Sequence, residues 1–459
     1  MFLDKFFAKE LFMNNLKVGY AKVVITPPMG IDISGYFHER KAEGVLDDLH
    51  AIALAVSDGV KTAAIVSLDI LDIHTESANI IRRHISEVCG IDYESIFLVC
   101  THTHTGPDFY HNHKTEIVRE YFNDTKLKIA DAVSFAIEDL ADAKMAYGVS
   151  RAPRISFVRR FKMKDGSFKT NPGVNNPEIA EPIGEVDERV NVVRFDREGK
   201  DTVVLINFGT HPDTVGGNLI SADWPGFVTK TFEAAIENTK CIFLNGAQGD
   251  VNHVNVFPRP GEDNGMFHDF DDVDRGYPHA RHMGNVVAGA AIQVYEKLVY
   301  TDVESIDYKN DVIKIPANVP SPEELPLAYK YDELHRSGRD EEIPFKGMAL
   351  TTVVAGAERK IRLKDGPEHF DFTLSAIRIG SLAFLGIPGE PFTSIGMGVK
   401  AGAGEFDLVL PCSDTNGYEG YFPNKEAYDE GGYETETSRF KAGVAEIITA
   451  EGIKLLKSF

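Results

Sequence analysis

His102 and His104 stand one residue apart, directly after residues 96–99, an apolar run with high strand propensity. Alternate residues of an extended chain point to the same side, so the two imidazoles can converge on one metal ion or one substrate atom. Gly106 and Pro107 then turn the chain away. A strand that ends in two imidazoles is typical of sites in α/β proteins, although two ordinary loop or core histidines would give the same pattern.

Other apolar runs end in the same manner. Residues 203–208 lead into His211, and residues 382–387 lead into a turn that carries Glu390. Two further runs, 241–244 and 408–410, also end in polar or glycine-rich turns. Because α/β sheets place ligands at the carboxyl ends of their strands, we expect these polar groups to meet in one pocket.

Strand and helix patterns surround these turns. Residues 52–56 and 63–68 flank Asp58-Gly59 and predict a hairpin. Apolar residues at spacings of three and four predict helices, the first with Thr75 as its N-cap. These helices are expected over 75–88, over 115–140, after Ser221, and at the end of the chain through Phe440, Val444, Ile447 and Leu455.

Two long segments, residues 257–279 and 316–346, are rich in proline, glycine or carboxylates and are predicted to be loops. Loops of this length in a compact domain often act as lids or binding elements, and a simple surface excursion explains them equally well. The carboxylates of the first segment do not follow the EF-hand spacing, so we predict no calcium site there.

The charge of the chain limits its partners. The 459 residues carry a net charge of −22, from 48 basic and 70 acidic side chains. Nucleic acids and anionic membranes need a basic face, so a small-molecule substrate fits better. A basic cluster between residues 151 and 164 includes Arg159 and Arg160. Such a cluster is usually solvated surface, and the alternative is an arginine that points into the site and holds a carbonyl or carboxylate.

Cysteine usage and hydropathy indicate a location. The four cysteines form no Cys-x-x-Cys motif, which predicts buried thiols in a reducing compartment. Charged residues interrupt the apolar ones in residues 1–16, so no signal-peptide core forms. No run reaches the about 18 apolar residues that a membrane span requires. We therefore predict a cytoplasmic protein without an integral membrane segment.

Several motifs occur in a fixed order along the chain. They are Thr101-His-Thr-His-Thr-Gly-Pro107, Thr210-His211, Ser221-Ala-Asp223, Gly249-Asp250, Pro388-Gly-Glu390, Asn416-Gly-Tyr-Glu-Gly-Tyr421 and Tyr433-Glu434. This series resembles the neutral/alkaline, non-lysosomal ceramidase family and runs from about Val18 to about Glu434. The ordered set is far more specific than any one motif.

The resemblance implies a zinc-dependent amidase with one Zn²⁺ per chain. Carried onto this sequence, the metal ligands of the family are His102, His211, Glu390 and Tyr421. Two imidazoles and a carboxylate suit a catalytic zinc that keeps room for water, whereas a tyrosine ligand is uncommon and comes from the resemblance alone.

The resemblance also implies that His104, Arg159 and Tyr433 line the reacting centre. Zinc lowers the pKa of a bound water from about 15.7 towards about 7, which supplies hydroxide to attack an amide carbonyl. Arg159 and the Tyr433 hydroxyl are then candidates to stabilise the oxyanion, and His104 is the candidate proton shuttle. Asp69 and Asp223 are expected to orient imidazole N–H groups.

The expected fold is α/β, with mixed β-sheets packed together and flanked by helices, and without the C-terminal immunoglobulin-like domain of secreted family members. We expect an N-terminal extension over residues 1–16 and one catalytic domain over 17–459. The turn that carries a serine in the family has Gly246 here, and Pro212 replaces a glycine. These departures weaken the expectation of ceramide and leave open a smaller or more polar N-acyl compound as substrate, within a ceramidase-like role in lipid and sphingolipid metabolism.

Three functions remain open. The first is a zinc-dependent hydrolase of an N-acyl amide bond. The second keeps the metal and changes the bond, as in a carbohydrate de-N-acetylase or a carboxylic ester hydrolase. The third is a metal-retaining binding protein that has lost catalysis.

Overall fold

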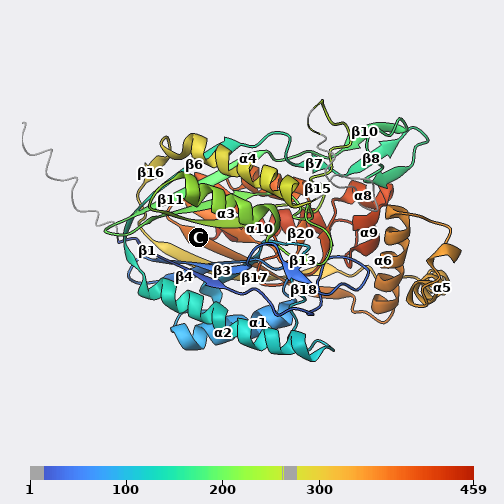
Figure 1. Cartoon of the computed structure of the whole chain (residues 1–459), viewed down its shortest axis with the longest axis horizontal. Helices are drawn as coiled ribbons and strands as arrows, with labels where there is room; N and C mark the ends of the chain where they lie inside the picture. The colour runs from blue at the N-terminus through green and yellow to red at the C-terminus, as the bar shows by residue number, and fades with distance from the viewer. Residues whose placement is uncertain (1–14, 261, 263–275) are drawn as a thin grey trace, which may run out of the picture.

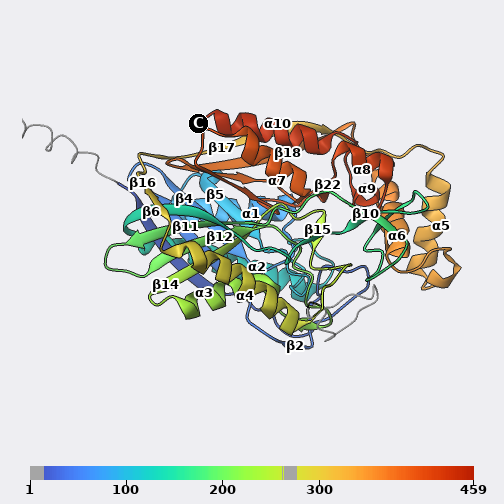
Figure 2. The ribbon, with the colours of Figure 1, turned by 90° about the horizontal axis from the view of Figure 1, so that it is seen from above.

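The computed structural model describes residues 15–260, 262 and 276–459. The expected N-terminal extension, except for its last two residues, and most of the predicted loop 257–279 lie outside the described residues. The remainder forms four layers, with two β-sheets face to face and helices on both outer sides (Figure 1; Figure 2). The expected α/β fold of packed mixed sheets flanked by helices is therefore confirmed.

The larger sheet, as far as the chain is described, has nine strands in the order β14-β12-β11-β6-β1-β3-β4-β5, with β16 beside β6. Its two ends, β4–β5 and β12–β14, are parallel pairs, and the predicted hairpin is the antiparallel pair β3–β4. The strands are β1 (Lys17–Val24), β3 (His50–Ser57), β4 (Thr62–Leu68), β5 (Ile96–Cys100), β6 (Ala141–Arg151), β11 (Arg189–Arg197), β12 (Thr202–Phe208), β14 (Thr239–Asn245) and β16 (Val299–Thr301).

The smaller sheet has the order β17-β18-β19-β21 and contains the parallel pair β19–β21. Its strands are β17 (Ile306–Pro316), β18 (His369–Ile379), β19 (Leu382–Gly386) and β21 (Leu408–Cys412). Phe97 and Val99 of the large sheet share one apolar core with Phe384 and Leu410 of the small one. Both faces of these central strands are covered, which explains why their sequences are continuous apolar runs.

Within the described residues, six helices form the outer layers. Helices α1 to α4 cover the large sheet, while α7 and α10 cover the small one (Figure 2). They are α1 (Thr75–Cys89), α2 (Glu116–Glu138), α3 (Asp223–Ala235), α4 (Tyr277–Tyr295), α7 (Thr393–Gly402) and α10 (Val444–Lys457). Thr75 is the first helical residue rather than the N-cap, and its hydroxyl donates to Glu419 at 2.5 Å. Across the described residues, no helix has the length and apolar character to cross a membrane.

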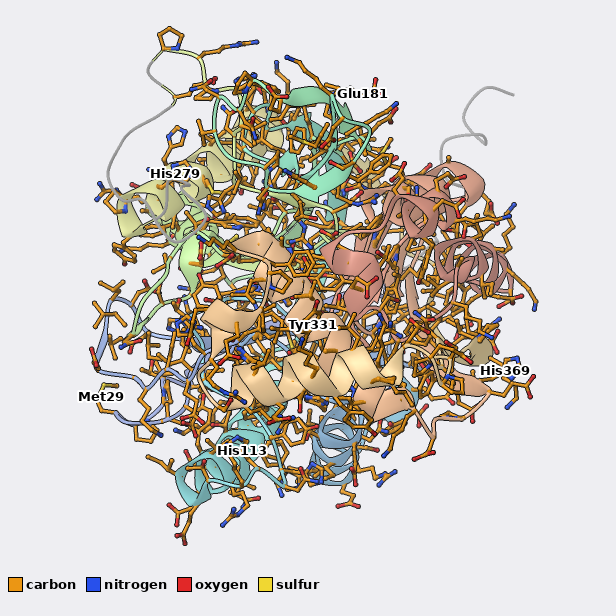
Figure 3. The ribbon with its side chains drawn as sticks, turned by 90° about the vertical axis from the view of Figure 1, so that its right-hand side faces the viewer. Met29, His113, Glu181, His279, Tyr331 and His369 are labelled. Atoms are coloured by element: carbon orange, nitrogen blue, oxygen red, sulfur yellow. The ribbon has the colours of Figure 1, made fainter. Side chains whose placement is uncertain are left out.

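The prediction of a loop over 316–346 is wrong. This segment contains α5 (Leu325–Arg336) and the 3₁₀ turn η2 (Asp340–Glu342), and it continues into α6 (Met348–Leu363) (Figure 3). Most of its prolines precede α5, and Pro326 lies in the first turn, where its missing N–H costs nothing. The two helices bury a small core of their own, which includes Leu334, Ile343 and Val354.

Short elements connect the layers. Strand β20 pairs in parallel with β22 and places Glu390 opposite Tyr421. These elements are β2 (Gly44–Val45), β7 (Phe157–Val158), β8 (Arg160–Met163), β9 (Phe168–Thr170), β10 (Ile179–Ile183), β13 (Leu219–Ile220), β15 (Val251–Asn252), β20 (Glu390–Pro391), β22 (Tyr421–Phe422), η1 (Tyr93–Ser95), α8 (Lys425–Glu430) and α9 (Tyr433–Thr437).

Candidate metal centre

His102 follows β5 at the edge where the two sheets meet. Its backbone has a left-handed φ of 72°, and its N–H donates to the Ile70 carbonyl at 3.0 Å. A non-glycine residue in this conformation is strained, and such strain concentrates at functional sites. The buried imidazole turns Nδ1 towards the Leu71 carbonyl at 3.0 Å and the Asp414 carboxylate at 3.2 Å. Its Nε2 is thereby directed into the site.

His211 follows β12 and is buried in the same place. Its Nδ1 lies 3.2 Å from the carbonyl oxygen of Gln248, which again directs Nε2 into the site. Burial, together with the charge of Arg159, lowers the pKa of His211 well below its usual value. The imidazole is therefore neutral, as a metal ligand must be.

Glu390 faces both histidines. Its Oε2 lies 3.5 Å from Nε2 of His102 and 3.3 Å from Nε2 of His211, while Oε1 accepts a 2.7 Å hydrogen bond from Tyr418. Among the described residues, the buried Oε2 has no hydrogen-bond partner. A carboxylate oxygen and two imidazole nitrogens thus converge, and their lone pairs repel unless positive charge stands between them.

The electrostatics of His102 support the same conclusion. Burial lowers the pKa of His102, but Asp414 and Glu390 outweigh it and raise this pKa to about 9. The carboxylates therefore favour a positive charge at this imidazole, carried either by a proton or by a cation bound at Nε2. Two imidazoles and one carboxylate form a donor set that zinc accepts, so these residues fit the metal that the sequence motifs imply.

Tyr421 closes the site from the side of β22. Its ring stacks on His211 with centroids 6.4 Å apart and planes 8° apart, and the guanidinium of Arg159 lies 5.2 Å from its centroid. Burial and Glu390 raise the pKa of Tyr421, while Arg159 acts in the opposite direction. Tyr433 lies beside it, with ring centroids 5.6 Å apart.

His104 stands with the two buried histidines. The imidazoles of His102, His104 and His211 each offer one nitrogen, and all three nitrogens lie within 4.8 Å of one another. Two arrangements fit this geometry. His104 is either a third imidazole ligand or the proton carrier beside a centre held by His102, His211 and Glu390.

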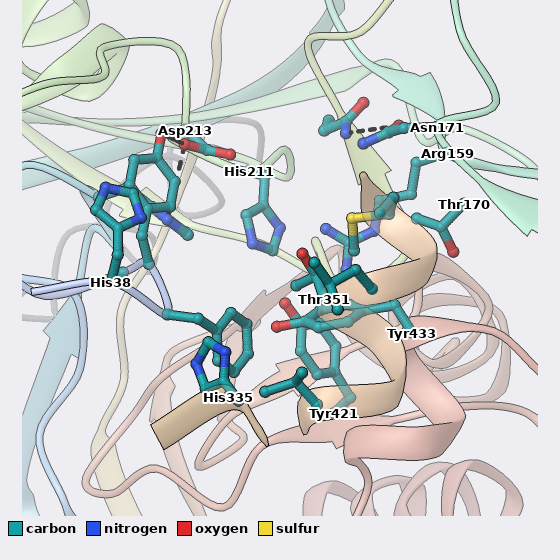
Figure 4. Close-up of a pocket in the computed structure, with 18 of the residues that line it drawn as sticks. His38, Arg159, Thr170, Asn171, His211, Asp213, His335, Thr351, Tyr421 and Tyr433 are labelled. Atoms are coloured by element: carbon teal, nitrogen blue, oxygen red, sulfur yellow. Dashed lines mark hydrogen bonds and ion pairs between the residues drawn. The ribbon is translucent and has the colours of Figure 1, made fainter. Parts of the chain in front are cut away.

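A pocket of ≈ 250 Å³ opens in front of these groups. His104, His211, Arg159, Tyr421 and Tyr433 all line it. Figure 4 shows His211 at its centre, with Arg159 and Tyr433 on one side and His38 on the other. The apolar side chains of the lining are Phe37, Met348, Leu350 and Val354.

Comparison with known proteins identifies the family and the fold of the chain. A family model described as neutral/alkaline non-lysosomal ceramidase, N-terminal, matches residues 16–267. The chain belongs to this ceramidase family. The resemblance drawn from the ordered motifs is thus confirmed, and the family supports a ceramidase-like hydrolase that acts on amide bonds.

Solved structures share the fold. A crystal structure of neutral ceramidase from Pseudomonas aeruginosa superposes with a TM-score of 0.71 at 18% identity, over 96% of this chain and 74% of that one. A structure described as ceramidase complexed with C2 gives the same TM-score and coverage at 17% identity. No curated protein matches the chain.

The two neighbouring arginines of this ceramidase-family chain have different surroundings. Arg159 lines the pocket, donates from Nε to Glu434 at 2.6 Å and donates from Nη2 to the Gly249 carbonyl at 2.6 Å. Arg160 pairs with Glu430 at 2.9 Å and lies 3.8 Å from the other carboxylate oxygen of Glu434. The guanidinium on the pocket wall is therefore that of Arg159, and Glu434 balances its charge.

The groups that orient the histidines differ from those expected. Asp223 accepts hydrogen bonds from the backbone N–H groups of Thr214 and Val215, so it holds the loop after His211 instead of an imidazole of the site. Asp69 likewise holds the backbone, because its Oδ2 accepts a 2.9 Å hydrogen bond from the N–H of His50.

Asp414, which is buried, and Tyr418, which is half-buried, take the orienting positions at His102 and Glu390 respectively. Both carried a signal in the sequence. Asp414 follows an apolar run, and Tyr418 lies within the Asn416–Tyr421 motif.

Proposed function

We propose that this chain is a zinc-dependent amidohydrolase that cleaves the N-acyl bond of a small amphiphilic substrate. The convergence of Glu390 Oε2 with Nε2 of His102 and Nε2 of His211 carries the proposal. These three residues would hold the metal, and Tyr421 is the fourth ligand implied by the family. Bound zinc lowers the pKa of a coordinated water from about 15.7 to about 7.

The residues of the chain supply the rest of the chemistry. His104 takes the proton of the attacking water and returns it to the amide nitrogen, which leaves poorly unless protonated. The pKa of Tyr433 is raised by burial and by Glu390, so its phenol stays neutral and can donate a hydrogen bond to the developing oxyanion. Arg159, fixed by Glu434, adds positive charge on the same wall.

The lining of the pocket supports an amphiphilic N-acyl substrate. Phe37, Met348 and Val354 provide apolar contact for an acyl chain, while Asn171 and Asn252 provide polar contact for the amine part. We propose further that residues 17–459 act as one catalytic unit, because Glu390 and Tyr421 lie far along the chain from His102 and His211. We also propose a cytoplasmic location, which the four free cysteines support.

Two measurements test the proposal together. Metal analysis of the purified protein should give one zinc per chain. A panel of N-acyl sphingosine, N-acyl amino acids, N-acetyl sugars and aryl esters should show turnover of amides that stops with a chelator and returns with zinc. A zinc-loaded protein that hydrolyses only N-acetyl sugars or only esters would support a carbohydrate de-N-acetylase or a carboxylic ester hydrolase. One that binds amides without turnover would support a binding protein.

A further inference from the structure

Asp213 stands two residues after His211 and lines the pocket beside His104. Its Oδ1 lies 3.7 Å from Nδ1 of His104 and accepts a 2.5 Å hydrogen bond from the hydroxyl of Tyr36 (Figure 4). The side chains of Asp213 and His104 are only 18% and 12% exposed. A carboxylate fixed by a phenol therefore faces one ring nitrogen of the histidine closest to the two presumed imidazole ligands.

The segments that carry Asp213 and Tyr36 also form hydrogen bonds with the backbone of His104. Its N–H donates to the Pro212 carbonyl at 3.1 Å, and its carbonyl accepts from Nη2 of Arg40 at 2.7 Å. Arg40 also lies over the ring of Tyr36, 4.1 Å from the centroid. A Cβ atom on Gly35 would stand 2.7 Å from Nδ1 of His104, so the chain leaves space for this imidazole. The fold therefore fixes the position of His104 and places the Asp213 carboxylate opposite its Nδ1.

We propose that Asp213, held by Tyr36, is a positioning residue that fixes the ring of His104 through Nδ1 and directs Nε2 at the amide nitrogen of the substrate. A carboxylate behind an imidazole fixes its tautomer and ring orientation. The separation of 3.7 Å is longer than a hydrogen bond, and contacts of this kind shorten when substrate binds.

The catalytic part of this inference rests on the proposed function. As the water oxygen bonds to the acyl carbon, its proton passes to Nε2 of His104. The C–N bond then breaks, its electron pair stays on nitrogen, and His104 returns the proton to that nitrogen. Asp213 acts only through the orientation of the ring and does not exchange a proton.

A direct test uses ring NMR of protein labelled with ¹⁵N-histidine, with His104 assigned by its loss in His104→Gln. In the wild type we expect one tautomer with the proton on Nδ1, and in Asp213→Asn a mixture of tautomers or a shift of the Nδ1 resonance. Glu76→Gln is the matched control, because Glu76 lies 3.6 Å from His111 at the surface, with its side chain 76% exposed. An unchanged His104 spectrum in Asp213→Asn overturns the inference, whether or not the protein hydrolyses amides.

A second test separates positioning from structural damage by changing the leaving group. Asp213→Asn should keep its zinc and its KM while kcat for an alkyl amide falls about 10- to 100-fold, the usual effect of losing such a partner. An aryl ester, whose phenolate departs without a proton, should lose less than the amide does, because only the proton of the attacking water still needs His104. Equal losses for both substrates, or loss of zinc, contradict the inference. A wild type that cleaves neither substrate contradicts the proposed function and leaves the NMR test to judge Asp213.

Discussion

Glu390 and Tyr421 are direct partners in the parallel pair of β20 and β22. This pairing brings a strand that follows β19 beside one that follows β21, so a carboxylate and a phenol reach the histidines of the other sheet. Gly389 makes the approach possible, with φ at 140° and space for no side chain, because a Cβ there would stand 2.5 Å from the Gly420 carbonyl oxygen. The candidate metal centre is thus assembled from both halves of the chain.

Substitution of single histidines distinguishes the two possible ligand sets. His102→Ala and His211→Ala should abolish zinc binding and activity, because each removes a ligand. His104→Ala should keep zinc and slow turnover about 10²- to 10⁴-fold, the range for a lost proton carrier. Zinc per chain, measured by mass spectrometry of the metal, gives the answer. Equal loss of zinc in all three variants would instead assign the metal to the three imidazoles.

Substitution of Gly389 tests the pairing of Glu390 with Tyr421. Gly389→Ala should destabilise the fold by about 2–4 kcal/mol, because a strained φ and a backbone clash act together. Gly90→Ala is the matched control, since its backbone is left-handed, with φ at 66° and ψ at 27°, and nothing lies within 4 Å of its would-be Cβ atom. The control should lose about 1 kcal/mol. Urea unfolding measures both, and similar losses would show that the approach to Gly420 is unimportant.

The central strands could be predicted from sequence because burial on both faces requires continuous apolar runs. Residues 96–99, 203–208 and 408–410 all fall within observed strands, and the polar residues after them do meet. The family resemblance of the ordered motifs then identified Glu390 and Tyr421 as candidate metal ligands. Strand patterns alone could not distinguish them from the other polar residues that follow the strands.

The partners of the histidines could not be predicted in the same way. The carbonyl groups of Leu71 and Gln248 face His102 and His211, and a backbone carbonyl has no sequence signal. Asp223 resembled an orienting carboxylate but serves a loop. The proline content of 316–346 suggests a loop, but Pro316, Pro320 and Pro322 precede α5 and Pro326 lies in its first turn, where a proline is compatible with a helix.

Tyr418 provides a test of how Glu390 is held. Tyr418→Phe removes the hydrogen bond to Oε1 and should lower zinc affinity about 10- to 100-fold while the fold remains. Tyr428→Phe is the matched control, because its hydroxyl donates at the same 2.7 Å to the Phe440 carbonyl, in the C-terminal core. That variant should lose about 1 kcal/mol of stability and no zinc affinity. Competition with a chromogenic chelator measures the affinity, and equal affinities in both variants would rule out the role of Tyr418.

The free energy of unfolding at acidic pH should depend on Asp187. Burial raises the pKa of this carboxyl, but Arg189 and Lys400 outweigh it and lower the pKa to about 2. The ordinary value in an unfolded chain is about 3.9. The folded state therefore holds the proton less tightly, and Asp187 contributes stability above about pH 4 that is lost as the pH falls towards 2.

Asp187→Asn should remove this contribution, which is about 3 kcal/mol from the shift of the pKa. The variant is also expected to be less stable at pH 7, because buried Lys400 loses the partner that lies 2.8 Å away. Urea unfolding of both proteins between pH 5 and pH 3 measures the difference, since the free energy of unfolding should fall less steeply in the variant. Parallel curves over this range would show that Asp187 titrates alike in the folded and unfolded chains, and the proposed linkage would then be absent.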